Sequence, residues 1–486
     1  MSEVDRPSSS GRTSASSPWA SLAVLSSGLL MTIIDGNIVT VAMPAIQSDL
    51  GFTAAGLAWV VNAYLIAFGG LLLLVGRLGD LVGRKRMFVS GLAVFTAASV
   101  LCGVANDQGV LVAARALQGV GGAMTSAVVL GMLVALFPEP RQQARAIAVF
   151  SAVGAAGGAI GTFLGGALTE ALNWHWIFLI NLPIGLVALV AAVRVLDGDA
   201  DADNVSGRGT GLGDGADYPG AALITSALML TVYTIVTTSE HTTPATLSFA
   251  AGSLLLYVAF AARQSRAARP LLRLRLFRSR VLTGANAVQI LMIAGMYGFQ
   301  YIGALYLQRV LGYGELLTGI AFLPAPVTIG VLMLGLSAKF IGRYGPYRTL
   351  LAGLALITAG LALLGRLPSD GSYAVDVLPG MLLLSAGFAA AMPAVTGLAM
   401  SGASQEDAGL ASGLFNTTQV VGGSLGLAVL TTLAAGRTES LTDTGTSALA
   451  AAADGYRLAF WIAAGIAAAG LALAATVLRP ASPRAS

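Results

Sequence analysis

The chain has very few of the side chains that build metal and disulfide sites. Its 486 residues include one cysteine, Cys102, and two histidines, His175 and His241. One cysteine cannot form an intramolecular disulfide, and a metal site built on cysteines needs several of them. We therefore predict no disulfide and no metal site, and look for the functional centre among other side chains.

The motifs of nucleotide-driven pumps and of common hydrolases are also missing. A Walker A loop ends with lysine followed by serine or threonine, whereas Lys85 precedes Arg86 and Lys339 precedes Phe340. The patterns H-E-x-x-H and G-x-S-x-G do not occur. These absences exclude a P-loop ATP-driven pump and leave a membrane-embedded transferase only as a remote alternative. We predict that the chain is not an enzyme.

Charged residues are scarce as well. They make up 10% of the chain, against about 25% in soluble domains, while hydrophobic residues make up 56% and the mean hydropathy is +0.79. The apolar residues form stretches long enough to cross about 30 Å of hydrocarbon at about 1.5 Å per residue. The sequence therefore predicts an all-α membrane protein whose surroundings are a lipid bilayer.

Apolar stretches bounded by charge, glycine or proline predict fourteen transmembrane helices, in a group of six, an inserted pair and a second six. These helices are expected at 19–43, 57–76, 87–105, 109–137, 144–170 and 174–195, at 219–238 and 245–262, and at 281–308, 317–338, 347–366, 375–401, 409–434 and 456–478. The expected domains are a disordered cytoplasmic tail (1–18), an N-terminal six-helix bundle (19–195), a polar linker (196–218), two inserted helices (219–262), a basic cytoplasmic loop (263–280), a C-terminal six-helix bundle (281–478) and a second cytoplasmic tail (479–486).

The basic residues fall in alternate loops, which predicts the orientation. Of the 27 Lys and Arg residues, 22 lie in the two tails and the even-numbered loops, four lie in the odd-numbered loops, and one, Arg115, lies inside a helix. Because cytoplasmic loops carry the excess of positive charge, both termini are expected in the cytoplasm. The pI near 9.3 thus reflects membrane topology, and we predict no nucleic-acid partner and a location in the inner (cytoplasmic) membrane.

Asp35 stands within the first expected helix, where a carboxylate costs at least about 2.5 kcal/mol. Arg115 is the expected partner: it lies about six residues, or ~9 Å, inside the outer end of the fourth helix, and Asp35 about eight residues, or ~12 Å, inside the outer end of the first. Gln118 follows Arg115 at i+3 and faces the same way. The pair serves either proton coupling or a structural ion pair that locks the bundle, and charge inside a membrane favours the former.

Two glycine patterns stand out. The loop Gly76–Arg86 places spaced glycines around Asp80 and ends in three basic residues, and its counterpart after the second helix of the second six is Ala338–Arg348, offset by 262 residues. Gly83 and Gly345 correspond in this weak internal repeat. The fifth helix carries Gly157, Gly161 and Gly165 at four-residue spacing, which allows another helix to approach closely.

Several of these segments resemble the successive signature motifs of a known family. In order along the chain they read IIDGNIVTVAMP, GRLGDLVGRKR, LVAARALQGVGGA, GAIGTFLGG and NWHWIFLINLPIG, and two segments of the second half, LYLQRVLGYGELLTGIAFLP and GLASGLFNTTQVVGGSLGLAVL, extend the match to about 20–478. They resemble the major facilitator superfamily, in its fourteen-helix drug:proton antiporter family. The resemblance implies the major facilitator fold: two six-helix bundles around a central cavity, plus two inserted helices.

The resemblance also implies roles for individual residues. It makes Asp35 the proton carrier with Arg115 and Gln118 as modulators. It implies a cytoplasmic conformational latch formed by Gly76, Asp80, Gly83 and Arg84, and an antiporter helix marked by Gly157, Gly161, Thr162, Gly165 and Gly166. The sequence departs from the family at Leu81, at His175 and at Thr162, which replaces the usual proline, so a straighter fifth helix is expected there.

Polar and aromatic residues in the second half are candidates for substrate contact. On the ninth helix Gln289, Met296 and Gln300 form a stripe with Tyr297 beside it, and the thirteenth helix carries Asn416 and Gln419 at i+3. Such a set suits a broad, mostly apolar pocket with few fixed polar contacts. Hydrogen bonding between helices is an equally good interpretation.

With these observations, the resemblance implies an antiporter that exports small hydrophobic or amphipathic molecules, such as drugs and antibiotics, in exchange for protons. Its energy source is the proton gradient, with no cofactor, and its expected partners are a small-molecule substrate, protons and the bilayer, with a monomer as the functional unit. A proton-coupled transporter of one specific metabolite on the same fold stays open as the alternative.

Overall fold

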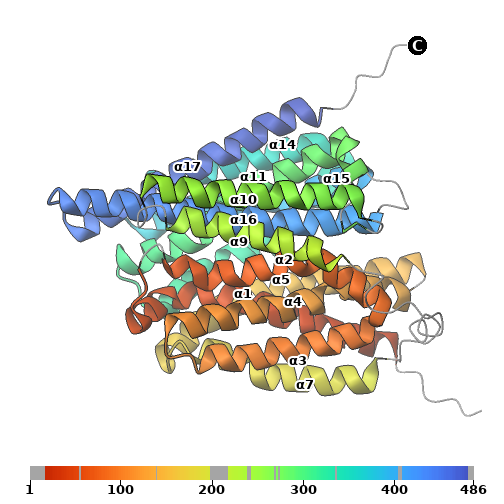
Figure 1. Ribbon diagram of the computed structural model, residues 1–486. Coiled ribbons are helices and arrows are strands. Elements are labelled where there is room, and N and C mark those ends of the chain that lie inside the picture. Colours follow the sequence, from red (N-terminus) through yellow and green to blue (C-terminus); the bar gives the residue numbers. More distant parts are fainter. Residues whose placement is uncertain are drawn as a thin grey trace, which may run out of the picture.

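The computed structural model describes residues 17–53, 56–137, 139–196, 217–237, 242–267, 270–271, 274–333, 337–402 and 408–479, and within these ranges the regular structure is helical (Figure 1). The first six-helix group comprises α1 (Pro18–Leu50), α2 (Trp59–Val82), α3 (Arg84–Gly103), α4 (Gln108–Leu136), α5 (Pro140–Ala171) and the broken pair α6 (Trp176–Leu179) and α7 (Asn181–Val195). The second comprises α11 (Arg280–Arg309), the broken pair α12 (Glu315–Phe322) and α13 (Pro324–Leu332), α14 (Ala338–Leu364), α15 (Leu378–Ser401), α16 (Ala408–Asp443) and α17 (Ala448–Val477). Between the groups lie α9 (Tyr218–Val236) and α10 (Thr243–Arg266), and short η1 (Gly56–Ala58), η2 (Leu274–Arg278) and π-helical η4 (Tyr373–Val377) connect longer elements.

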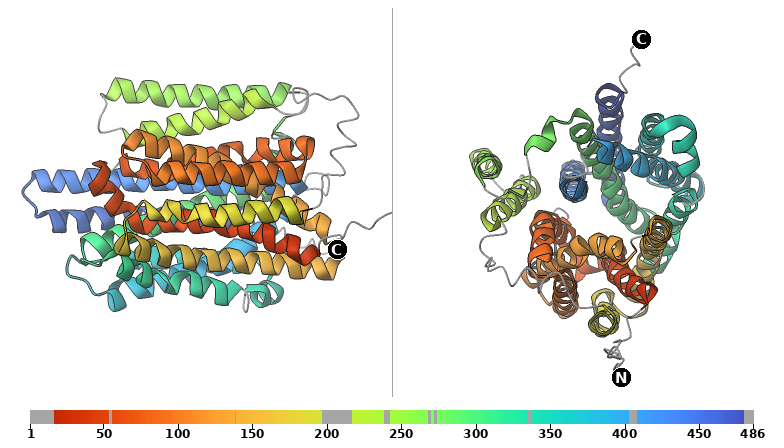
Figure 2. Two further views of the ribbon diagram at one scale, coloured as in Figure 1. Left: turned by 90° about the horizontal axis from the view of Figure 1, so that it is seen from below. Right: turned by 90° about the vertical axis from the view of Figure 1, so that its right-hand side faces the viewer.

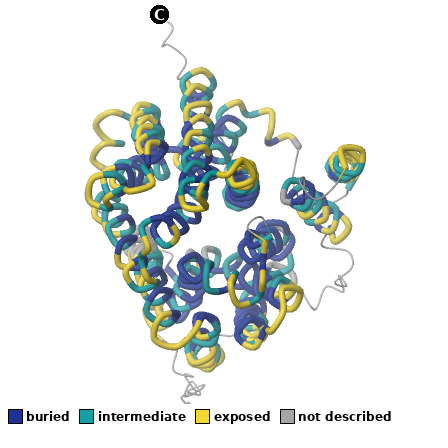
Figure 3. The backbone as a smooth tube through the Cα atoms, turned by 90° about the vertical axis from the view of Figure 1, so that its left-hand side faces the viewer, coloured by how far each residue is buried: buried dark blue, intermediate teal, exposed yellow. Residues whose placement is uncertain are grey.

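Twelve helices among the described residues are long and apolar enough to cross a membrane. The two remaining long helices are α2 and α5, of 24 and 32 residues. In the two six-helix groups, buried residues gather toward the middle and most exposed residues lie on the outside (Figure 3), the distribution expected where lipid surrounds the protein.

The two six-helix groups repeat one packing pattern. In the first, α1 packs on α5 and α7, and α3 packs on α4 and α7; in the second, α11 packs on α16 and α17, and α14 packs on α15 and α17. The glycines matched in the sequence share a backbone conformation, since Gly83 has φ 109° and ψ 132° and Gly345 has φ 80° and ψ 159°. Both φ angles are positive, a conformation in which a residue with a side chain is strained. The correspondence of Gly83 with Gly345 in the weak repeat is therefore confirmed.

Several predicted helix ends are wrong. The first helix was expected to stop at residue 43, before Pro44, but α1 continues through the proline to Leu50. A proline inside a membrane helix is tolerated because neighbouring groups satisfy the freed carbonyl.

The last two helices are also longer than predicted. α16 continues to Asp443 and α17 begins at Ala448, so the expected loop at 435–455 is a helical hairpin. It projects beyond the ends of the other helices (Figure 1, Figure 2), and Asp454 in it pairs with both Arg437 and Arg457. Hydropathy marks where apolar residues end, whereas a helix continues for as long as its backbone bonds do.

The inserted helices lie to one side of both bundles (Figure 2). α9 contacts α2 and α16, one from each half, and Leu228 and Val232 of α9 form a buried cluster with Ile66 of α2 and Ala428 of α16. α10 packs on α9, and its buried residues are Ser253 and Gln264 alone. The inserted pair therefore covers the seam between the halves on this side.

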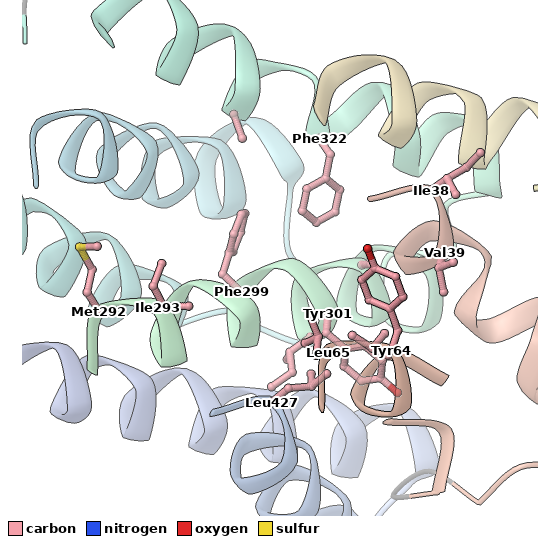
Figure 4. Close-up of a cluster of buried hydrophobic side chains, with 14 of the residues drawn as sticks. Ile38, Val39, Tyr64, Leu65, Met292, Ile293, Phe299, Tyr301, Phe322 and Leu427 are labelled. Atoms are coloured by element: carbon pink, nitrogen blue, oxygen red, sulfur yellow. The ribbon is translucent and has the colours of Figure 1, made fainter. Parts of the chain in front are cut away.

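The halves meet through α1 and α5 on one side and α2 on the other, against α11, α12, α13 and α16. Figure 4 shows the buried cluster at this junction, where Ile38 and Tyr64 from the first half lie near Phe299 and Phe322 from the second. The ring centres of Phe299 and Phe322 are 5.5 Å apart.

Candidate functional site

Asp35 lies near the middle of α1 with its side chain completely buried. One carboxylate oxygen, Oδ2, is 2.5 Å from Nη1 of Arg115. The other, Oδ1, accepts hydrogen bonds from Nε2 of Gln118 at 2.7 Å and from Nδ2 of Asn181 at 3.0 Å. The ion pair expected from the sequence is confirmed, even though α1 is longer than predicted.

Arg115 is almost completely buried, with 1% of its side chain exposed. Its Nε donates to the carbonyl of Val60 at 2.8 Å, and its Nη1 also donates to Oε1 of Gln118 at 2.6 Å. The guanidinium carbon lies 4.6 Å from the centre of the Tyr64 ring and 5.7 Å from that of Phe178. These contacts offset the large cost of taking a guanidinium out of water.

Two members of this network were not predicted from the sequence. Asn181, the first residue of α7, is completely buried, and Ser99 of α3 accepts a hydrogen bond from Nε2 of Gln118 at 2.8 Å. The available signal was an asparagine within the apolar segment WIFLINLPIG. Within the described structure Oδ1 of Asn181 has no hydrogen-bond partner. Because Nδ2 is the atom that faces Asp35, this amide must flip before it can accept from a donor at position 35.

The network lies inside the N-terminal bundle. Its members come from α1, α3, α4 and α7, with Tyr64 of α2 against the guanidinium. The arrangement can hold a carboxylate in its charged form, since Arg115, Gln118 and Asn181 all donate to it.

The second-half residues predicted to contact substrate do not share one environment. Gln300 crosses to the first half, where its Nε2 donates to Oδ1 of Asn37 at 2.7 Å, two residues beyond Asp35. Gln289 is buried within the second half, and its Oε1 accepts from Thr418 of α16 at 3.0 Å. Oδ1 of Asn286, a residue not predicted from the sequence, accepts from the same Thr418 hydroxyl at 2.7 Å. For Gln289 the geometry favours hydrogen bonding between helices.

The other four candidates, Met296, Tyr297, Asn416 and Gln419, are half-buried. The Tyr297 ring lies against Gly423 of α16, where an added Cβ would come within 2.8 Å of it. Their contact with substrate stays a prediction. No group of three or more His, Cys, Asp or Glu side chains with metal-binding spacing occurs among the residues that the structure describes.

Comparison with known proteins decides the family. The family model described as Major Facilitator Superfamily matches residues 25–427. The chain belongs to the major facilitator superfamily. It is 36% identical over 455 residues to the puromycin resistance protein pur8 of Streptomyces alboniger, covering 92% of this chain and 89% of that relative. It is 37% identical over 439 residues to the cephamycin export protein CmcT of Amycolatopsis lactamdurans, covering 89% of this chain and 88% of that one.

Solved structures agree on the fold. A bacterial homolog of the human lysosomal transporter Spinster, in an inward-facing and unoccupied conformation, matches with a TM-score of 0.67 and covers 97% of this chain and 100% of that chain. The two sequences are 16% identical, so this likeness shows the fold alone. As a member of the superfamily, the protein is a multi-pass membrane transporter.

The structure describes some of the residues of the predicted cytoplasmic latch. Gly83 forms the tight turn between α2 and α3, and Arg84 donates from Nη1 to the carbonyl of Gly131 on α4 at 3.1 Å, within the first half. An added Cβ at Gly76 would meet Ala127 at 3.9 Å. The side chain of Asp80 lies outside the described residues, as does 403–407, so the latch role of these residues stays a prediction.

The glycines of α5 that mark the predicted antiporter helix pack against two different neighbours. A Cβ on Gly161 or Gly165 would lie 2.8 Å or 2.5 Å from a backbone oxygen of α1, and one on Gly157 would lie 3.1 Å from the Ile33 side chain, so these three face α1. Gly166 instead faces the other half, where its Cβ would lie 2.3 Å from the carbonyl oxygen of Glu315. Helix α5 therefore packs closely against α1 of its own bundle and against α12 of the second bundle.

Thr162 behaves as its chemistry predicts. Its hydroxyl donates to the carbonyl of Gly158, four residues earlier, at 2.8 Å. The helix is continuous from Pro140 to Ala171. Threonine keeps the backbone donor that proline would remove, which agrees with a continuous helix at this position. That the helix is straighter than in relatives stays a prediction.

Proposed function

We propose that this protein is a proton-coupled antiporter that exports small hydrophobic or amphipathic molecules across the cytoplasmic membrane. The observation that carries the proposal is a completely buried carboxylate, Asp35, paired with Arg115, in a chain whose relatives are named as antibiotic resistance and export proteins. An exporter driven by protons needs an ionisable group that is sheltered from water and has a partner that responds to its charge.

In the proposed arrangement the chain crosses the membrane fourteen times. The twelve candidate spans and the long helices α2 and α5 together supply this number. With both termini in the cytoplasm, Leu50 and Ala171 end their helices at the outer face, and Val82 and Arg84 lie at the inner face. The protein acts as a monomer, with the two bundles as moving units and 219–262 as the inserted pair.

Three of the described hydrogen bonds between the halves support a state that is closed on the outer side. They join Gln308 to the carbonyl of Val41 at 2.9 Å, Arg309 to Gln47, and the amide of Leu316 to Glu170 at 3.0 Å. All of these lie toward the outer ends of α1, α5 and α11. In the proposed cycle, this contact breaks when the protein turns outward.

The proposed cycle alternates substrate and proton on the two faces. In the outward state Asp35 takes a proton from the acidic side and its attraction to Arg115 is lost. In the inward state, substrate binding or renewed contact with Arg115 favours release of that proton. Because each half-cycle carries one of the two ligands, the proton gradient drives substrate outward without a cofactor.

A growth-inhibition panel tests the export function. We expect an efflux-deficient host that carries the gene to tolerate several chemically different antibiotics or dyes at higher concentration than the host without it. The protonophore-treated strain serves as control, since collapse of the gradient should remove the difference. Protection against a single compound would favour the alternative of one specific metabolite, and no protection by an expressed protein would contradict the proposal.

The cytoplasmic latch gives a second prediction. Asp80 is expected near the cytoplasmic start of α16, around residue 409, because a helix N-terminus favours an anion, and Glu406 and Asp407 lie at the same end. Asp80→Asn should lower the efflux rate about tenfold while expression stays the same. Efflux of a fluorescent substrate from cells with matched protein levels measures this. An unchanged rate would remove the latch role.

A further inference from the structure

Helix α12 begins without a capping side chain of its own. Its N-cap residue is Gly314, with φ −67° and ψ 169°, and no side-chain cap bond is made from that residue. The first amide groups of a helix have no partner within the helix. Serine, threonine, asparagine or aspartate at the N-cap usually accepts a hydrogen bond from the second or third of them, and glycine cannot.

The missing acceptor comes from the other half of the protein. Oε2 of Glu170, at the outer end of α5, accepts a hydrogen bond from the amide of Leu316 at 3.0 Å. Leu316 is the second residue of α12, the position that an N-cap side chain normally serves. The negative charge of the carboxylate also suits the positive end of the helix dipole.

Close backbone packing holds Glu170 at this place. One helical turn before it, Gly166 lies so near α12 that an added Cβ would be 2.8 Å from Cα of Leu316. From the other side, a Cβ on Gly319 would be 2.7 Å from the carbonyl oxygen of Thr162. The cap therefore forms only while the outer parts of α5 and α12 touch, and it is lost when they separate.

We propose that Glu170 is a gating residue: it caps α12 across the two halves and thereby stabilises the outward-closed conformation. The inference rests on the proposed transport by alternating exposure of a central site. An N-cap contributes a factor of about five to a helix equilibrium. Because the cap exists only in the outward-closed conformation, it multiplies the ratio of outward-closed to outward-open molecules by that factor.

The cap role differs from a proton-carrier role in a way that substitution can show. Glutamine at position 170 keeps an acceptor oxygen but cannot ionise, so Glu170→Gln should keep most of the cap and most of the coupling. Glu170→Ala removes the acceptor. Gly314→Ser supplies an acceptor from within α12 itself, and its backbone conformation accepts a side chain, with the flexible Glu170 carboxylate 3.2 Å from the new Cβ.

Outer opening can be measured as the reactivity of a cysteine at the contact. Thr162 is buried, its hydroxyl bonds only within α5, and native Cys102 is buried. In spheroplasts treated with an uncoupler, a membrane-impermeant maleimide reaches Thr162→Cys from outside only after opening. The labelling rate is then proportional to the open fraction. Total labelling after denaturation corrects for expression, and the parent without Thr162→Cys gives the background.

We expect Glu170→Ala to raise the labelling rate about fivefold and Glu170→Gln to raise it less. Gly314→Ser should also raise it, because the helix keeps a cap in both states, and in that background Glu170→Ala should have no further effect. Glu439→Ala, a matched loss of one exposed carboxylate on α16, should leave the rate unchanged.

An unchanged rate in Glu170→Ala would overturn the cap role, and so would a full-sized effect in the Gly314→Ser background. The measurement uses no substrate and no proton gradient. Failure of the export function therefore leaves this result intact, and failure of the cap leaves the export function intact.

Discussion

We expect Asp35→Asn to abolish substrate-induced proton release, because asparagine has nearly the shape of aspartate but cannot ionise. The fold should persist. With its oxygen toward Arg115, asparagine turns its NH2 group toward Nε2 of Gln118 and Nδ2 of Asn181, which both donate to Asp35 in the wild-type chain. A flip of the Asn181 amide presents its Oδ1 as an acceptor, and Gln118 still donates to Ser99. Arg115 keeps its bonds to Val60 and Gln118. The change should reduce gradient-driven transport to background and leave substrate binding measurable.

Proteoliposomes with a pH-sensitive dye measure this result. The matched control is Asp49→Asn on the same helix: Asp49 accepts from the indole of Trp174 at 2.9 Å near the outer end of α1, and asparagine keeps an acceptor oxygen. We expect the control to couple at the wild-type rate. If Asp35→Asn couples at that rate as well, the proton carrier is another group.

Arg115→Ala should impair both transport and stability, for one physical reason. It leaves the completely buried carboxylate of Asp35 with only the two amide donors, Gln118 and Asn181. Removing one partner of a buried ion pair typically costs about 3–5 kcal/mol. We expect a clearly lower thermal midpoint of the detergent-solubilised protein, together with loss of efflux.

A double variant separates these two effects. Asp35→Asn with Arg115→Gln removes both charges and keeps polar groups at both positions, so it should recover much of the stability lost in Arg115→Ala while transport stays absent. If Arg115→Ala unfolds at the wild-type temperature, the ion pair does not support the bundle. If the double variant transports, the pair is structural only.

The sequence alone determined the membrane character, the helical segments and the pairing of Asp35 with Arg115. Hydropathy follows directly from composition, and the depth of a charged residue follows from its distance along a helix of fixed rise. For the same reason Gln118, at i+3 from Arg115, was placed correctly in the network. The ordered motifs carried the family, which the matched residues 25–427 confirm.

The tertiary structure decided what depends on how helices rotate and meet. Sequence spacing put Gln289 and Gln300 on one stripe, yet Gln289 bonds to Thr418 within its own half and Gln300 reaches Asn37 in the other. Asn181 enters the charged network only because α7 packs against α1. Local sequence fixes the periodicity of a helix but not which neighbour each face meets, since that results from packing between segments far apart in the chain. The bond from Leu316 to Glu170 joins residues 146 positions apart, and no local pattern encodes it.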